Sequence, residues 1–196
     1  MSKLDPGLLR HSRAFVAEPP VLHADLSAIG LSIPAPEELA AARAIAARLI
    51  GPHIASLETF HAVAEKNAAG MMVYREQGQV TGVLAFLLLR PPALYALATD
   101  KFDAVNPDLE LLARPDEEPL AAYGWGLAAT SLRAAAVVLN GAGLFRGLTP
   151  SIPFFARAAT VDGRRILCGR LGYTPFPRNT TGLLWSPSRE MGTESA

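Results

Sequence analysis

The arginines of the C-terminal half are the residues whose chemistry is easiest to interpret. No acidic residue lies between Glu118 and Asp162, and that interval contains Arg133, Arg146 and Arg157. Three more arginines follow before residue 173, at positions 164, 165 and 170. Because few carboxylates compete for these cations locally, we expect this half of the chain to bind a small anionic ligand. The formal net charge is zero and no dense basic stripe occurs, which argues against nucleic acid as a partner.

A second feature suited to an anion is the start of a helix predicted at residues 131–140. The residues that lead into it are small: Ala128, Ala129, Thr130 and Ser131. Small residues allow an anion to approach the free N–H groups that begin a helix. Arg133 lies in the first turn of this helix, so the sequence predicts an anion site here.

Other candidate motifs are weaker. Gly124-x-Gly126-x-x-Ala129 matches a dinucleotide fingerprint by letter, but the acid expected about 20 residues later is missing. We interpret it as a chance match. Cys168 is the single cysteine, which excludes an internal disulfide; we read it as a small buried residue, with a mechanistic role as the alternative. No metal site is expected, because no pair of the four histidines has metal-ligand spacing.

The elements that must position these residues follow from apolar periodicity. Two helices are predicted at residues 36–50 and 57–66, the second capped by Ser56. A hairpin follows, with strands at 71–76 and 79–90 joined by Gln77-Gly78. Its second strand is apolar on both faces and is therefore expected at the centre of a sheet. After a long irregular segment come a strand at 120–129, the helix at 131–140, a strand at 154–158, a helix capped by Thr160, and a strand at 182–185.

This order predicts an α/β fold with a mixed central sheet flanked by helices on both faces. Residues 1–35 are expected to form an arm with little regular structure, broken by prolines, with a short strand somewhere in 14–33. Residues 36–185 form one domain with an acidic insertion at about 91–119, and residues 186–196 form a flexible tail. The longest apolar run, residues 83–89, is too short to span a bilayer, and no signal peptide is evident, so we expect a cytoplasmic protein without a membrane partner.

The element order, with Leu171-Gly172-Tyr173 after the last helix, resembles the GNAT superfamily of N-acyltransferases, which use acetyl-coenzyme A (acetyl-CoA) or another acyl-CoA. The resemblance covers residues 36–185. It implies that residues 120–129 form the central strand, 130–140 the pyrophosphate helix, and 154–173 the second strand–helix pair. It also implies acetyl-CoA or another acyl-CoA as co-substrate, and a small amine or a protein amino group as acceptor.

The resemblance also implies a set of site residues. The cofactor would contact the end of the central strand and the start of the helix, at Leu127, Ala128, Ala129, Thr130, Ser131 and Arg133. Attack on a thioester requires a deprotonated amine, and Glu118 and Tyr173 are the candidates for handling protons. The family often has a tyrosine four residues before the exit glycine, as the acid that reprotonates the leaving thiolate, and this chain has Cys168 there.

Two hypotheses remain at this point. The first is an acyl-CoA-dependent N-acyltransferase. The second is a GNAT-like CoA-binding or regulatory module that has lost transfer chemistry, because the glycines usual in the family's phosphate turn and its tyrosine are replaced here. The acceptor, the acyl chain length and the oligomeric state, a homodimer included, stay open.

Overall fold

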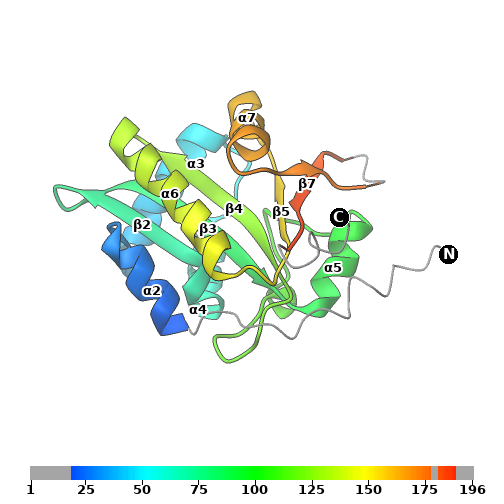
Figure 1. The fold of residues 1–196 in the computed structure, drawn as a ribbon. Helices are drawn as coiled ribbons and strands as arrows, with labels where there is room; N and C mark the ends of the chain where they lie inside the picture. Colours follow the sequence, from blue (N-terminus) through cyan, green and yellow to red (C-terminus); the bar gives the residue numbers. More distant parts are fainter. Residues whose placement is uncertain (1–18, 178–180, 189–196) are drawn as a thin grey trace.

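A seven-stranded sheet forms the centre of the chain in a computed structural model that describes residues 19–177 and 181–188 (Figure 1). The strands lie in the order β1-β2-β3-β4-β5-β7-β6. Their bounds are β1 (Leu31–Ser32), β2 (Met71–Glu76), β3 (Gln79–Leu89), β4 (Ala121–Ala129), β5 (Phe154–Arg157), β6 (Thr174–Pro175) and β7 (Leu183–Ser186). Neighbouring strands are antiparallel except β4 and β5, which are parallel, so the sheet is mixed.

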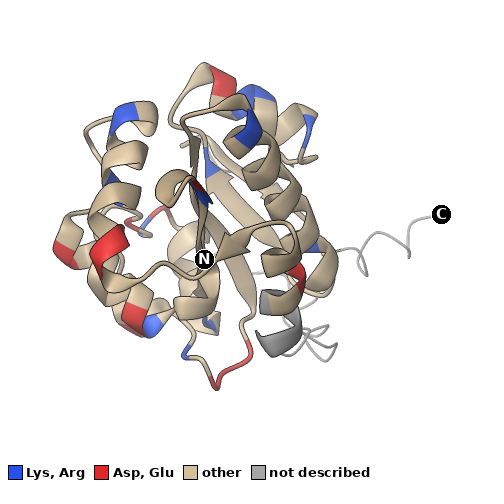
Figure 2. Cartoon of the chain, turned by 90° about the vertical axis from the view of Figure 1, so that its left-hand side faces the viewer, with Lys and Arg blue, Asp and Glu red and all other residues tan. Residues whose placement is uncertain are grey.

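Helices cover both faces of this sheet, as the edge-on view in Figure 2 shows. The α-helices are α2 (Pro19–Ala28), α3 (Leu39–Ile50), α4 (Leu57–Lys66), α5 (Pro91–Ala98), α6 (Leu132–Leu148) and α7 (Val161–Gly169), and short 3-10 turns occur at Pro36–Glu38, Ala68–Gly70 and Leu109–Leu111. Buried residues of α2, α6 and α7 share one hydrophobic cluster, and those of α3, α4 and α5 pack against the opposite face. The predicted class, a mixed sheet with helices on both faces, is therefore confirmed, and the order from α3 to β7 follows the order that the resemblance implies.

The predicted hairpin is confirmed, and β3 is a central strand. Gln77 and Gly78 both have positive φ angles, 52° and 78°, which is the backbone of a tight two-residue hairpin turn. Along β3, Leu84 and Phe86 belong to the cluster beneath α6, while Leu87 belongs to the cluster on the other face. Two apolar faces on one strand thus correspond to two layers of helices.

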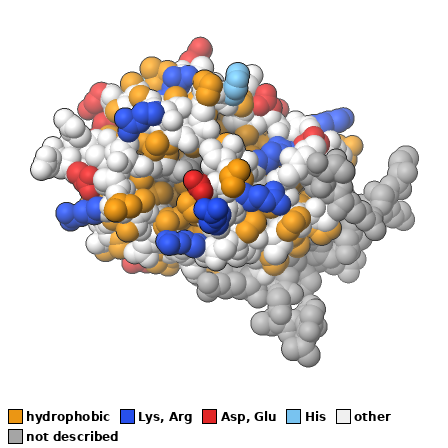
Figure 3. Space-filling view, turned by 90° about the horizontal axis from the view of Figure 1, so that it is seen from above, with side chains coloured by type: hydrophobic (Ala, Val, Ile, Leu, Met, Phe, Trp, Pro, Cys, Tyr) orange, Lys and Arg blue, Asp and Glu red, His pale blue; other side chains and the backbone are white. Residues whose placement is uncertain are grey.

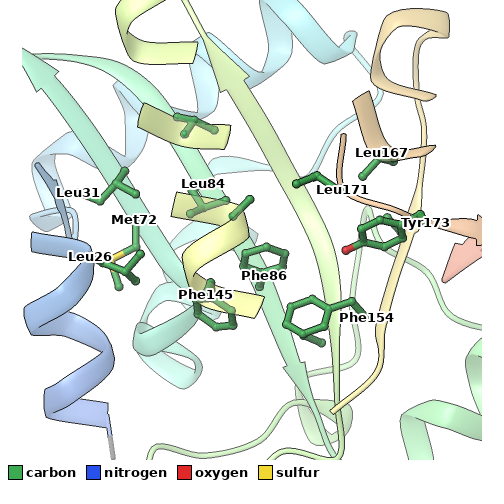
Figure 4. Close-up of a cluster of buried hydrophobic side chains, with 14 of the residues drawn as sticks. Leu26, Leu31, Met72, Leu84, Phe86, Phe145, Phe154, Leu167, Leu171 and Tyr173 are labelled. Carbon is green, nitrogen blue, oxygen red and sulfur yellow. The ribbon is translucent and has the colours of Figure 1, made fainter. Parts of the chain in front are cut away.

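The prediction that residues 1–35 have little regular structure is wrong for their described part, whereas the short strand expected there is present. Residues 19–28 form helix α2, and Leu31–Ser32 pairs with β2 as the predicted short strand. Pro19 and Pro20 stand in the first turn of the helix, where a proline is tolerated because its missing N–H has no partner there anyway. Leu26 and Leu31 are completely buried, so this segment contributes to the core (Figure 4).

Helix α6 runs past the predicted end at Asn140-Gly141 and stops at Leu148. Gly141 lies inside the helix because the neighbouring elements leave no room for a side chain. A Cβ atom added there would be 2.2 Å from Cδ1 of Leu31 and 3.1 Å from Cδ2 of Leu84. The glycine thus permits close packing of α6 on the sheet, and it does not end the helix.

One further expectation needs correction at the C-terminal side. Ser186 is the last residue of β7, and both Ser186 and Ser188 are buried, so the segment expected as a flexible tail begins inside the fold. The remaining residues of that tail lie outside the described residues. None of the described helices combines the length and the apolar character that a bilayer crossing requires.

The acidic insertion at residues 91–119 packs on the body of the protein through buried apolar side chains, such as Leu97 and Leu112, and through its charges and its backbone. It contains α5 and a 3-10 turn, and Leu112 forms a bridge with Leu89 at the end of β3. Glu117 pairs with Arg90 at 3.2 Å, and Glu110 lies 3.5 Å from Nζ of Lys66. Several of its carboxylates therefore neutralise cations of the body of the protein.

Candidate ligand-binding cleft

The parallel strands β4 and β5 pair over a short distance and then separate. They share three residue pairs, the last between Gly124 and Ala156. Beyond this point β4 continues to Ala129, and within the described part of the chain its partner there is β3 alone, on its other side. The register between β3 and β4 shifts here, because Ala85 pairs with Gly126 while Phe86 pairs with Gly124. The extra residue, Trp125, forms a β-bulge, and a bulge bends a strand and increases its twist.

A cleft of about 380 Å³ lies between the separated strands. This volume falls within the range of small-molecule sites. The cleft is lined by residues 124–129 of β4, residues 156–160 at the end of β5 and after it, the inner sides of α6 and α7, and the C-terminal end of α3. Its walls are mainly apolar, and the charged side chains among them are Arg157 and Asp162. Seen from above, the molecule presents hydrophobic side chains with several Lys and Arg side chains among them (Figure 3).

Small residues keep the β4 wall of the cleft open. A Cβ atom added at Gly126 would have its nearest neighbours at 3.9 Å (Ala85) and 4.0 Å (Ile50). At Gly124 the nearest atom would be the Cβ of Ala156, at 3.4 Å. Trp125 and Leu127 are the large side chains of this stretch, and the small residues beside them let a ligand reach the backbone of β4.

The start of α6 is capped as the sequence indicates, with Ser131 as N-cap. Its hydroxyl oxygen accepts a hydrogen bond from the Ala134 N–H at 3.0 Å. The N–H of Thr130 donates to the carbonyl oxygen of Thr81 at 2.8 Å, so this N–H is used in pairing with β3 and not for a ligand. Of the predicted cofactor residues, Leu127, Ala128 and Ala129 line the cleft, whereas Thr130, Ser131 and the exposed Arg133 lie beyond its lining.

The start of α7 forms the opposite wall. Thr160 is the predicted N-cap, and its hydroxyl oxygen accepts from the Gly163 N–H at 2.9 Å. Asp162 in the first turn pairs with Arg165 at 3.0 Å, and both side chains are exposed. Gly172 has a φ of 67°, and the Tyr173 N–H donates back to the carbonyl of Leu167 at 3.0 Å, which closes the helix end.

Two of the arginines expected to serve an anion are engaged within the fold. Arg146 donates to the carbonyl oxygen of Leu171 and to the hydroxyl of Ser186, and its guanidinium lies over the rings of Phe154 and Tyr173, 5.6 Å and 5.3 Å from their centroids. It therefore joins α6 to the segments around β7 and does not serve the cleft.

Arg157 does line the cleft, but it binds the insertion. It donates to the carboxylate of Asp100 and, at 3.2 Å, to the hydroxyl of Thr181. Burial raises the pKa of the neighbouring Tyr123, and the positive charge of Arg157 partly opposes that shift. The positive charge beside the cleft is thus partly neutralised by Asp100.

The three candidates for proton transfer lie outside the lining of the cleft. Glu118 is exposed and precedes β4, at the end of that strand opposite to α6. Tyr173 is only 3% exposed, and burial raises the pKa of its hydroxyl; its ring lies in the core close to Phe154 (Figure 4). Cys168, expected to be buried, is exposed on α7, because α7 directs only Leu167 fully into the core. The roles proposed for the three remain predictions.

Sequence reasoning missed two acidic residues that lie beside this region. Glu76 accepts a hydrogen bond from the hydroxyl of Ser131 at the start of α6, and Asp100 binds Arg157. Glu76 could have been found from its place just before the hairpin turn. The antiparallel register of β2, β3 and β4 brings that turn next to the end of β4, where α6 begins. Asp100 has a φ of 60°, which sequence alone does not reveal.

No protein-family model matches the chain, and no curated protein matches it. Among solved structures, the chain is similar to an N-acetyltransferase from Staphylococcus aureus Mu50. The two share 10% sequence identity with a TM-score of 0.49, over 80% of this chain and 99% of that chain. At this level of likeness, the description of the site rests on the geometry of this chain alone.

Proposed function

We propose that the protein is an N-acyltransferase that uses acetyl-CoA or another acyl-CoA as donor and a small amine or a protein amino group as acceptor. The observation that carries this proposal is the separation of β4 and β5 beyond Gly124, with the cleft between them. The β4 edge beyond Gly124 pairs with none of the described strands on this side, and it lies in a cleft lined by small and apolar side chains. Such an edge favours an extended, mostly uncharged ligand that carries amide groups.

The pantetheine arm of an acyl-CoA has this chemistry. Its two amides can hydrogen-bond with the free edge of β4 as an added strand would. The small residues Gly124, Gly126 and Ala128 leave the strand accessible, and the apolar side chains of α6 and α7 suit the aliphatic parts of the arm. When bound, the donor supplies the acyl thioester, and the chain's own residues orient it and exclude water.

A second candidate is a module that binds CoA without transferring the acyl group. It is favoured by one observation: Glu118, Tyr173 and Cys168 all lie outside the described lining of the cleft. Asp162, the carboxylate within that lining, is paired with Arg165. This candidate predicts binding without turnover.

The experiment combines binding and turnover in a matched pair of variants. Gly126→Leu fills the cleft, and the distances of 3.9–4.0 Å around its Cβ leave room for the fold to form. Gly143→Leu is the control, because this glycine is exposed on α6 with no atom within 4 Å of an added Cβ. Affinity for CoA is measured by calorimetry, and release of free thiol from acetyl-CoA is followed with a panel of amines.

We expect the wild type and Gly143→Leu to bind CoA, and Gly126→Leu to bind it at least about tenfold more weakly. Thiol release that depends on an added amine supports the transferase, whereas binding without any release supports the module. If the wild type binds no CoA at millimolar concentration, both candidates are wrong, since a ligand of the native state must bind measurably and raise its stability.

A further inference from the structure

Helix α6 begins with a carboxylate bound to its N-cap. Glu76, the last residue of β2, is partly buried, and its two carboxylate oxygens lie 3.2 Å and 3.0 Å from the hydroxyl of Ser131, which donates to them. The same hydroxyl oxygen accepts from the Ala134 N–H. Glu76, Ser131 and the first turn of α6 thus form one hydrogen-bonded chain.

This arrangement changes what the start of α6 offers a ligand. The N-terminus of a helix carries a partial positive charge and free N–H groups, which favour an anion. The carboxylate of Glu76 already neutralises part of that positive charge, and it would repel a second anion at the same place. The Thr130 N–H is also engaged, by Thr81. The start of α6 is therefore less receptive to phosphate than its exposed position next to the cleft suggests.

We propose that Glu76 determines donor specificity by weakening the binding of a diphosphate at the start of α6. The inference rests on the proposed function and on the family resemblance, which implies that the diphosphate of the donor lies at the start of α6. The donor is then recognised mainly through its uncharged acyl-pantetheine arm. The cleft agrees with this, because its walls are mainly apolar and Arg157, the cation in its described lining, is paired with Asp100.

Glu76→Gln tests the proposal. The amide oxygen of glutamine can still accept from Ser131, so the cap of α6 is kept while the negative charge is removed. Glu58→Gln is the matched control, because Glu58 is an exposed carboxylate in the first turn of another helix, α4. Dissociation constants of CoA and of pantetheine are measured by calorimetry for the wild type and both variants, with circular dichroism to verify that each variant is folded.

The proposal expects the wild type to bind CoA and pantetheine with affinities within about tenfold of each other. Glu76→Gln should bind CoA about tenfold more tightly, with its affinity for pantetheine unchanged, and Glu58→Gln should change neither. If both ligands bind but Glu76→Gln leaves the affinity for CoA unchanged, Glu76 only caps α6 and the inference is wrong. If neither ligand binds to any of the three proteins, the proposed function is wrong, and the inference with it.

Discussion

Replacement of Gly141 by alanine tests how closely α6 packs on the sheet. In an ordinary helix interior this change is stabilising by about 1 kcal/mol, because alanine is the better helix former. Here the added Cβ would lie 2.2 Å from Cδ1 of Leu31 and 3.1 Å from Cδ2 of Leu84. Both leucines are completely buried, so neither can turn away into solvent.

The magnitude follows from these two opposing effects. Forcing an extra carbon into a packed core costs about 1–3 kcal/mol. Subtracting the gain in helix propensity leaves a net loss of up to about 2 kcal/mol. Gly143→Ala is the control. This position lies in the same helix, an added Cβ there meets no described atom within 4 Å, and so the change brings only the gain in helix propensity. The free energies of unfolding of the two variants should then differ by about 1–3 kcal/mol.

The assay is thermal unfolding of the wild type and both variants, followed by circular dichroism. At about 2–4 °C per kcal/mol, the melting temperature of Gly141→Ala should lie roughly 2–12 °C below that of Gly143→Ala. If the two variants melt at the same temperature, or if Gly141→Ala is the more stable, then β1 does not pack against α6 as described and the reasoning is refuted.

Three further predictions concern single side chains. The hydrogen bond and charge of Arg75 lower the pKa of Glu38 below its ordinary value of 4.5. Urea unfolding should therefore show the wild type more stable than Glu38→Gln by a constant amount above pH 4.5, and this difference should disappear as the pH falls through the lowered pKa. A difference that persists at lower pH would contradict the prediction. Tyr173 should stay protonated in alkaline solution until the chain unfolds, because burial raises the pKa of its hydroxyl. Spectrophotometric titration of the wild type and of Tyr173→Phe checks this, and the two titration curves should be equal below the pH at which the protein unfolds. Cys168 is exposed, so a thiol reagent should modify it without denaturant, and Cys168→Ser should bind CoA as the wild type does; at least tenfold weaker binding would show that Cys168 contributes to the site.

The features of the fold that depend on neighbouring residues could be predicted from the sequence. Ser56 and Thr160 cap helices as expected, because a cap is a contact between residues three apart. The hairpin at Gln77-Gly78 is equally local. Gly141 was misinterpreted, since its role depends on Leu31, which is distant in the sequence and close only in the folded chain.

The candidate site could be predicted only in part for the same reason. Leu127, Ala128 and Ala129, predicted as cofactor contacts, lie together in the cleft wall because they belong to one strand, and their contact with a cofactor stays a prediction. The contact of Ser131 with Glu76 was missed, because it requires the register of three strands. Helix α2 was missed because it presents no clear amphipathic face, and its two prolines look like interruptions when the first turn is not considered.

The two outer strands of the sheet have a consequence for how copies of this chain meet. Each is only two residues long: β1 at one border and β6 at the other, where Pro175 has no N–H to donate. Exposed strand borders act as templates for intermolecular β-pairing and aggregation, and short strands with proline suppress this. Half of the residues are apolar and the net charge is zero, a composition that favours precipitation. We therefore expect these short borders to protect the native chain from edge-to-edge aggregation, while the open stretch of β4 stays within the cleft, where a small ligand fits more easily than a second sheet.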